Sequence, residues 1–223
     1  MFSVTIINDY LEKLFNKLSI RGGFIMDPFR ELKILKMLSE DPSLILMFKE
    51  KSITENMWKV AIENEPSLFQ HVKNPSEQLI LLALKEDGAN IKYLKHMGIT
   101  ITPQMIYCAV KNYPGAIFLL PPELRTRSVV EFACTEDPTL MRDVKLKKEF
   151  IDRRLRQDPT LVRFLKNPTE DQYCKALEVN PDMCAFIETF TPKMIDIILS
   201  KYPDIVQLIP RLQNAIYEKR VSE

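Results

Sequence analysis

Residues 73 to 87 decide the fold, and their sequence is Lys73-Asn74-Pro75-Ser76-Glu77-Gln78-Leu79-Ile80-Leu81-Leu82-Ala83-Leu84-Lys85-Glu86-Asp87. The pattern returns, altered, as Lys166-Asn167-Pro168-Thr169-Glu170-Asp171-Gln172-Tyr173-Cys174-Lys175-Ala176-Leu177-Glu178-Val179-Asn180. Weaker copies lie between and around these two stretches. One pattern that recurs at a nearly fixed spacing is typical of repeat proteins, in which each unit stacks on its neighbours.

One position, which we call the anchor, recurs every 21 to 26 residues and is nearly always proline. The anchors are Pro42, Pro66, Gly88, Pro114, Pro138, Pro159, Pro181 and Pro203. Several follow an Asp or Asn, as Pro138 follows Asp137. This pair suits a helix start, because the Asp oxygen accepts from an unpaired backbone N–H and proline lacks the N–H that would stay unpaired. Each anchor therefore predicts the beginning of a helix.

The positions four and eight residues before each anchor, and three and six residues after it, are apolar in every copy. Around Gly88 they are Leu84, Ile80, Ile91 and Leu94. Spacings of three and four residues indicate helices. Five residues before the anchor most copies have alanine, which lets helices approach closely. Each unit is thus predicted to be a helix of roughly ten residues, a sharp corner and a second helix of roughly seven.

Isolated helices this short are unstable in water and persist by stacking on their neighbours. We therefore expect an all-α protein, a right-handed α-solenoid of about eight short helical hairpins with an N-terminal capping helix. Residues 1–28 are assigned to the capping helix and a linker, residues 29–210 to the helical-repeat solenoid, and residues 211–223 to a C-terminal cap or tail.

These features together resemble a known short repeat. They are Asn-Pro-Ser/Thr-Glu at 74–77 and 167–170, an apolar helix ending in Ala-Leu, and a short helix ending near Tyr93-Leu94-Lys95. The pattern resembles a tandem αα-repeat domain of unknown function found in bacteriophages, large DNA viruses and some protists. The likeness is best over 73–95 and 166–187 and weakest over 122–150. It implies a helical array and a phage or viral origin, and it brings no catalytic residues.

The composition argues against most chemistry. The two histidines, His71 and His96, are not spaced as metal ligands, and five glycines build no phosphate-binding loop. His71 is expected to pack partly, at the edge of the core. The carboxylates fall at predicted helix caps and on polar faces, with no paired arrangement for acid–base catalysis. We expect no enzymatic activity, no cofactor and no metal.

The four cysteines, Cys108, Cys134, Cys174 and Cys184, lie in apolar helical contexts and are expected to be reduced core thiols. The first residues lack a signal-peptide pattern, and no apolar run approaches the ~20 residues that span a bilayer. We therefore expect a cytoplasmic protein without membrane contact, located in the host cell if it is phage-encoded.

The strongest local charge lies between residues 142 and 166, with nine Lys and Arg against four Asp and Glu in a chain of net charge +1. The candidate partner-binding residues here are Arg142, Lys145, Lys147, Lys148, Arg153, Arg154, Arg156 and Arg163. Arg153 and Arg154 stand where other copies are mostly apolar or small, so the repeat does not explain them. A basic patch fits an acidic protein surface or a nucleic-acid backbone. No interleaved exposed aromatic residues are expected here to stack on bases, which favours a protein partner.

A second candidate surface is the position seven residues before the anchor. It is often apolar in the first half of the chain, at Leu35, Leu81 and Tyr107, and mostly acidic in the second. These three form either an exposed apolar strip or half-buried core, and the sequence leaves both open.

The sequence thus favours a non-enzymatic protein–protein interaction module, and the resemblance implies a phage or viral protein that binds and modulates a host protein. The alternative is a nucleic-acid-binding helical-repeat protein that uses the basic patch 142–166.

Overall fold

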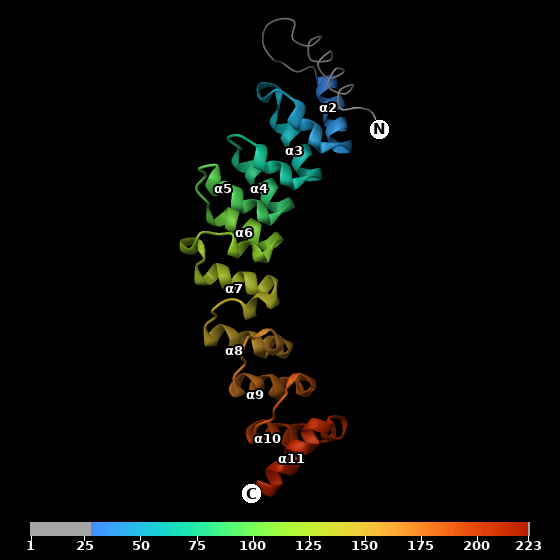
Figure 1. Cartoon of the computed structure of the whole chain (residues 1–223), viewed down its shortest axis with the longest axis vertical. Coiled ribbons are helices and arrows are strands. Elements are labelled where there is room, and N and C mark those ends of the chain that lie inside the picture. The colour runs from blue at the N-terminus through green and yellow to red at the C-terminus, as the bar shows by residue number, and fades with distance from the viewer. Residues whose placement is uncertain (1–27, 223) are drawn as a thin grey trace, which may run out of the picture. The chain divides into compact units, whose positions relative to one another are not determined.

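The computed structural model of the chain describes residues 28–222 (Figure 1). Within this range the chain forms α-helices and 3₁₀-helices and no β-strand, so the all-α prediction is confirmed. The predicted N-terminal capping helix falls in residues 1–27, outside the described residues. The chain divides into two compact units, Met1–Leu119 and Leu120–Glu223, which are described separately.

Unit 1 holds the α-helices α2 (Pro28–Glu40), α3 (Glu55–Asn64), α4 (Glu77–Glu86), α5 (Ile91–His96) and α6 (Pro103–Asn112). Its 3₁₀-helices are η1 (Pro42–Met47), η2 (Glu50–Ser52), η3 (Pro66–His71), η4 (Gly88–Asn90) and η5 (Pro114–Phe118). α2 packs on α3, α3 on α4, and α4 on α6 (Figure 1).

Unit 2 holds the α-helices α7 (Arg127–Glu136), α8 (Lys148–Gln157), α9 (Glu170–Val179), α10 (Pro192–Lys201) and α11 (Pro210–Ser222). Its 3₁₀-helices are η6 (Pro122–Leu124), η7 (Pro138–Arg142), η8 (Pro159–Phe164), η9 (Pro181–Phe186) and η10 (Pro203–Leu208). α8 packs on α9 and α9 on α10, while η7, η8 and η9 lie in sequence beside one another.

Each anchor starts a 3₁₀-helix, whereas a second helix of about seven residues was expected. Asp137 and Asp158 each accept a hydrogen bond at 3.0 Å from the backbone N–H two residues on, in Thr139 and Thr160. The apolar residues three and six after the anchor lie on one side of a helix with three residues per turn. A 3₁₀-helix therefore points both of these residues toward the core. Val162 in η8 and Leu165 at its C-cap are buried in this way.

Gly88 replaces proline because α6 comes too close. A Cβ atom at Gly88 would lie 2.1 Å from the Ala109 carbonyl oxygen, so only glycine fits. The Gly88 N–H also donates to Asn112 Oδ1 at 2.8 Å, a bond that proline cannot make.

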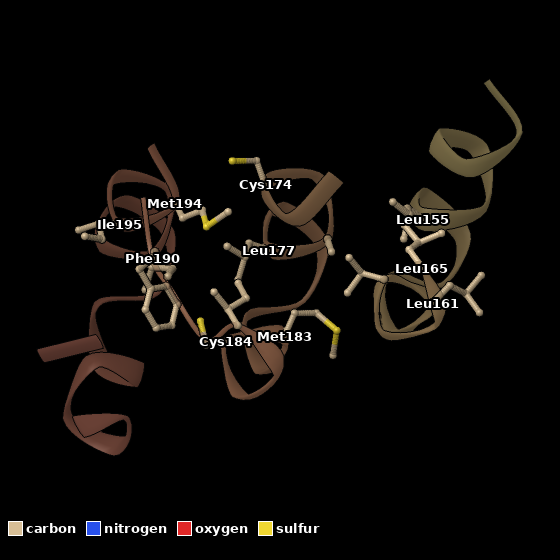
Figure 2. Packing of buried hydrophobic residues seen from close by; sticks show 14 of the residues in the cluster. Leu155, Leu161, Leu165, Cys174, Leu177, Met183, Cys184, Phe190, Met194 and Ile195 are labelled. Atoms are coloured by element: carbon tan, nitrogen blue, oxygen red, sulfur yellow. The ribbon is translucent and has the colours of Figure 1, made fainter. Parts of the chain in front are cut away.

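The predicted apolar positions form the core in both units. Figure 2 shows the cluster of unit 2, whose labelled side chains come from three successive repeats: Leu155, Leu161 and Leu165, then Cys174, Leu177, Met183 and Cys184, then Phe190, Met194 and Ile195. One position departs from prediction. Leu199 is 37% exposed, and Ile198, which stands where α9 has Ala176, is fully buried in its place.

A recurring polar link joins successive α-helices. The N-cap hydroxyl of one helix accepts from its own backbone and donates to a first-turn glutamate of the helix before. Ser76 Oγ accepts from the Leu79 N–H at 3.2 Å and donates to Glu55 Oε1 at 2.9 Å. Thr54 and Thr191 do the same with Glu31 and Glu170.

Candidate partner-binding surfaces

Three of the predicted basic residues take part in interactions within unit 2. Arg153 lies 3.9 Å from Glu131 and sits over the Phe150 ring, and Lys148 lies 3.3 Å from Asp171. Arg154 is half-buried and donates to Gln157 Oε1 at 3.3 Å, while its Nε is buried without a hydrogen-bond partner. The two arginines that the repeat seemed not to explain are therefore tied to neighbouring side chains.

Four other cations form a basic quartet, consisting of Arg142, Lys145, Arg163 and Lys166. Arg142 and Arg163 lie four residues after their anchors, and Lys145 and Lys166 lie seven after. Because η7 and η8 pack side by side, these equivalent positions lie on the same edge of unit 2. All four side chains are exposed, and no carboxylate of the described residues lies within 4.0 Å of their charged nitrogens.

Aromatic rings adjoin one side of the quartet. The Arg163 guanidinium lies 4.7 Å from the ring centre of Phe164 and 5.9 Å from that of Phe186. Phe186 is exposed. A cation over a ring is held in place by the ring's negative face, so Arg163 is the most oriented member of the quartet.

Lys147 and Arg156 are also exposed and lie at the two ends of α8. Lys147 is the N-cap residue of α8 and makes no side-chain cap bond, whereas α7 and α9 begin with capping threonines. A cation is disfavoured at a helix N-terminus by the helix dipole. Local rules are broken in this way most often at functional sites.

The predicted apolar strip splits in the structure. Leu35 is half-buried and packs against the core cluster around Leu38 and Met57, so it follows the core alternative. Leu81 and Tyr107 instead come together in a hollow of about 530 Å³ between α4 and α6, which we call the α4–α6 groove. It is lined by Leu81, Leu82, Lys85, Gln104, Tyr107, Cys108, Lys111 and Asn112.

Two polar contacts hold the walls of the α4–α6 groove. Asn112 Nδ2 donates to the Lys85 carbonyl at 2.7 Å and closes one end. In the middle, Cys108 Sγ contacts the Leu81 carbonyl at 3.5 Å. Burial raises the pKa of the Cys108 thiol, so this sulfur is protonated near neutral pH.

Exposed apolar side chains also occur on two separate 3₁₀-helices of unit 1, η1 and η5, four and five residues after the anchors. They are Leu46, Met47, Phe118 and Leu119, with exposures from 39% to 50%. His71 occupies an equivalent position and is exposed, so the expectation that it packs at the core edge is wrong. These exposed residues were not predicted, because the position four after the anchor is polar in other copies, as at Gln70, Lys92 and Arg142.

A hollow of about 540 Å³ beside His71 includes Phe48, Trp58, Glu50 and Glu55. Both carboxylates have partners, since Glu50 accepts from Lys73 at 2.8 Å and Glu55 accepts from Ser76 at 2.9 Å. Across the described residues, no three His, Cys, Asp or Glu side chains are grouped as a metal site would need.

The remaining cysteines are buried thiols. Burial raises the pKa of Cys134 to about 12 and that of Cys184 to about 11, and it also raises the pKa of Cys174. A thiol of this kind is a poor nucleophile at neutral pH.

The helices described between residues 28 and 222 include none with both the length and the apolar character to cross a bilayer. Comparisons of the chain with protein-family models, with curated proteins and with solved structures gave no match.

Proposed function

We propose that this protein is a non-enzymatic interaction module that binds an acidic surface of a partner protein through the basic quartet. In this proposal it acts in the cytoplasm, as a phage or viral protein that modulates a host protein. In the same proposal its repeats form a right-handed solenoid of about eight hairpins, and the packing of helix on helix within each unit supports the stacking.

The observation that carries the proposal is the contrast within the basic region. Lys148, Arg153 and Arg154 interact inside unit 2, but Arg142 and Lys145 are exposed with no carboxylate of residues 28–222 in contact. Like charges on one edge repel one another, and an acidic partner relieves that repulsion.

Nucleic-acid binding is the alternative, and one contact favours it. Arg163 lies beside the exposed ring of Phe186, and a cation next to an aromatic ring is also the pairing that holds a stacked base. A protein partner ranks first because a single exposed ring offers a short stacking platform.

The test uses the charge-reversal variant Arg142→Glu/Lys145→Glu/Arg163→Glu/Lys166→Glu. Immobilised full-length protein is exposed to a lysate of the natural host, and retained proteins are identified by mass spectrometry. We expect an acidic protein that the wild type retains and the variant does not. The matched control is Lys92→Glu/Lys95→Glu, since Lys92 and Lys95 occupy the same two repeat positions in unit 1.

The same variants decide the alternative. Labelled 20-nucleotide RNA and double-stranded DNA are titrated at 50 and 200 mM salt. If the quartet contacts four phosphates of a duplex, affinity falls about 10²-fold between these salt concentrations, and the reversal variant loses binding. Retention of one acidic protein by wild type and both variants alike overturns the role of the quartet.

A further inference from the structure

We propose that the α4–α6 groove is a second docking site, which takes a short acidic segment of a partner protein that carries one large hydrophobic side chain. This surface lies in unit 1, and the proposal does not depend on the basic quartet.

The groove exists because one long side chain is missing. In two of the three successive helix pairs of unit 2, the residue seven before an anchor is bridged by the residue six before the next anchor; the third pair, Cys174 and Ile197, is uncharged. Glu131 meets Arg153 in this way, and Asp152 meets Lys175 at 2.7 Å. The equivalent pair between α4 and α6 is Leu81 and Cys108. The short thiol reaches only the Leu81 carbonyl, so the space that an ion pair closes in unit 2 stays open here.

The floor and the rim of the groove differ in chemistry. Leu81 and Leu82 are half-buried and Tyr107 is 51% exposed, which gives an apolar floor and wall. The charged lining residues are Lys85 and Lys111, and no carboxylate is among the lining residues. Lys111 Nζ lies 5.7 Å from the centre of the Tyr107 ring, so one cation is held at the aromatic wall.

This combination specifies the occupant. A hydrophobic side chain placed between Leu81 and Tyr107 removes apolar surface from water. Carboxylates on either side of it meet Lys85 and Lys111, whereas a basic segment is repelled. A volume of about 530 Å³ falls within the roughly 300–1,000 Å³ of hollows that hold ligands. One wall is rigid, because Asn112 is bonded at both ends of its amide, to Lys85 and Gly88.

A double variant in which an ion pair fills the groove, called the closed variant, provides the control. Leu81→Asp/Cys108→Lys reproduces the Asp152–Lys175 pair of unit 2 and should fill the space without disturbing the helices. A displayed library of random 12-residue peptides is selected on the full chain, with the closed variant present in solution as competitor. We expect enriched peptides with two or more Asp or Glu around one Phe, Trp, Leu or Met.

One enriched peptide is then synthesised and its affinity measured by fluorescence anisotropy. Lys85→Glu/Lys111→Glu should weaken binding at least tenfold, and a peptide with Lys in place of its acidic residues should regain binding to that variant. Lys92→Glu/Lys95→Glu, outside the groove, should bind as the wild type does. The bound peptide should also slow alkylation of Cys108, whose side chain lines the groove.

Tyr107→Ala serves as a second variant, since an exposed ring is removed without loss of core, and it should weaken binding at least fivefold. Circular dichroism confirms that each variant is folded. The proposal is overturned if no peptide is enriched, if the enriched peptides lack acidic residues, or if the charge reversal leaves affinity unchanged. A failure of the quartet variants to lose their partner leaves these results untouched, so the two proposals fail separately.

Discussion

Gly88→Pro would give this anchor the residue that every other anchor carries, and the structure predicts that it destabilises the protein. Two costs add. The new ring carries a Cβ that falls 2.1 Å from the Ala109 carbonyl oxygen, and the backbone of α6 must move to make room. The substitution also removes the N–H that donates to Asn112.

The size of the effect follows from these contacts. Overpacking against a backbone atom costs about 1–3 kcal/mol, and loss of one hydrogen bond costs about 0.5–1.5 kcal/mol. Gly88→Pro should therefore lower the free energy of unfolding by about 1.5–4.5 kcal/mol, a large share of the roughly 5–15 kcal/mol of a typical domain. Gly88→Ala keeps the N–H and should show the packing cost alone, about 1–3 kcal/mol.

Urea unfolding followed by circular dichroism at 222 nm measures these changes. Gly115→Ala is the matched control, because the atoms nearest to a Cβ there belong to the end of the exposed Tyr113 side chain and not to backbone. It should change stability by less than about 1 kcal/mol. Wild-type stability in Gly88→Pro would refute the reasoning and show that proline fits at every anchor.

Four further predictions concern single side chains. Ser76→Ala should lower the free energy of unfolding by about 0.5–2 kcal/mol in urea, since it removes the cap of α4 and the link to the preceding helix; an unchanged midpoint contradicts this. Arg154→Ala should leave stability unchanged or raise it by up to about 1 kcal/mol, because it removes a buried unpaired donor; a marked loss would show that this side chain supports the core. Hydrogen bonds to Asp152 and Asp171 raise the pKa of Lys175, and hydrogen bonds from Lys175 and Lys148 lower the pKa of Asp171. The Asp171 carboxylate therefore contributes to the free energy of unfolding above its ordinary pKa of 3.8, and this contribution is lost as the pH falls through its lower pKa in the folded protein. Lys175→Met should then make the free energy of unfolding depend less on pH in the acid range. Iodoacetamide on the native protein should alkylate Cys108 before the three buried cysteines, and uniform labelling measured by mass spectrometry would contradict the described burial.

The apolar positions counted from each anchor were predictable from the sequence, because equivalent residues of stacked repeats are buried in the same way. Leu84, Val110 and Leu177 are fully buried, as their positions require. A second helix was predicted after each anchor, but its type was not, as the spacing of three between Val162 and Leu165 illustrates. Two apolar residues three apart fit an α-helix and a 3₁₀-helix alike, so the short-range hydrogen bonds of the cap decide between them.

The candidate surfaces were harder to predict, because their chemistry depends on partners more than twenty residues away. Arg153 looked unexplained until Glu131 appeared beside it on the preceding helix. Tyr107 and Leu81 looked like members of one strip with Leu35, which instead packs against the core. The groove could not be predicted from Cys108 alone, because the effect of its small side chain depends on the space that the equivalent residue, Lys175, fills by bridging α8 and α9.

The link between an N-cap hydroxyl and the preceding helix has a consequence for how the array comes apart. Where that link exists, opening one helix end also releases its neighbour, so the two exchange their amide hydrogens together. The N-cap residue of α8, Lys147, makes no side-chain cap bond, so α8 is the natural place for such an opening to start. Its fraying would release Lys148 from Asp171 and so loosen α9, while α7 keeps its own Thr126 cap. A stacked array of this kind therefore has a built-in order of unravelling, set by the residue at the start of each helix.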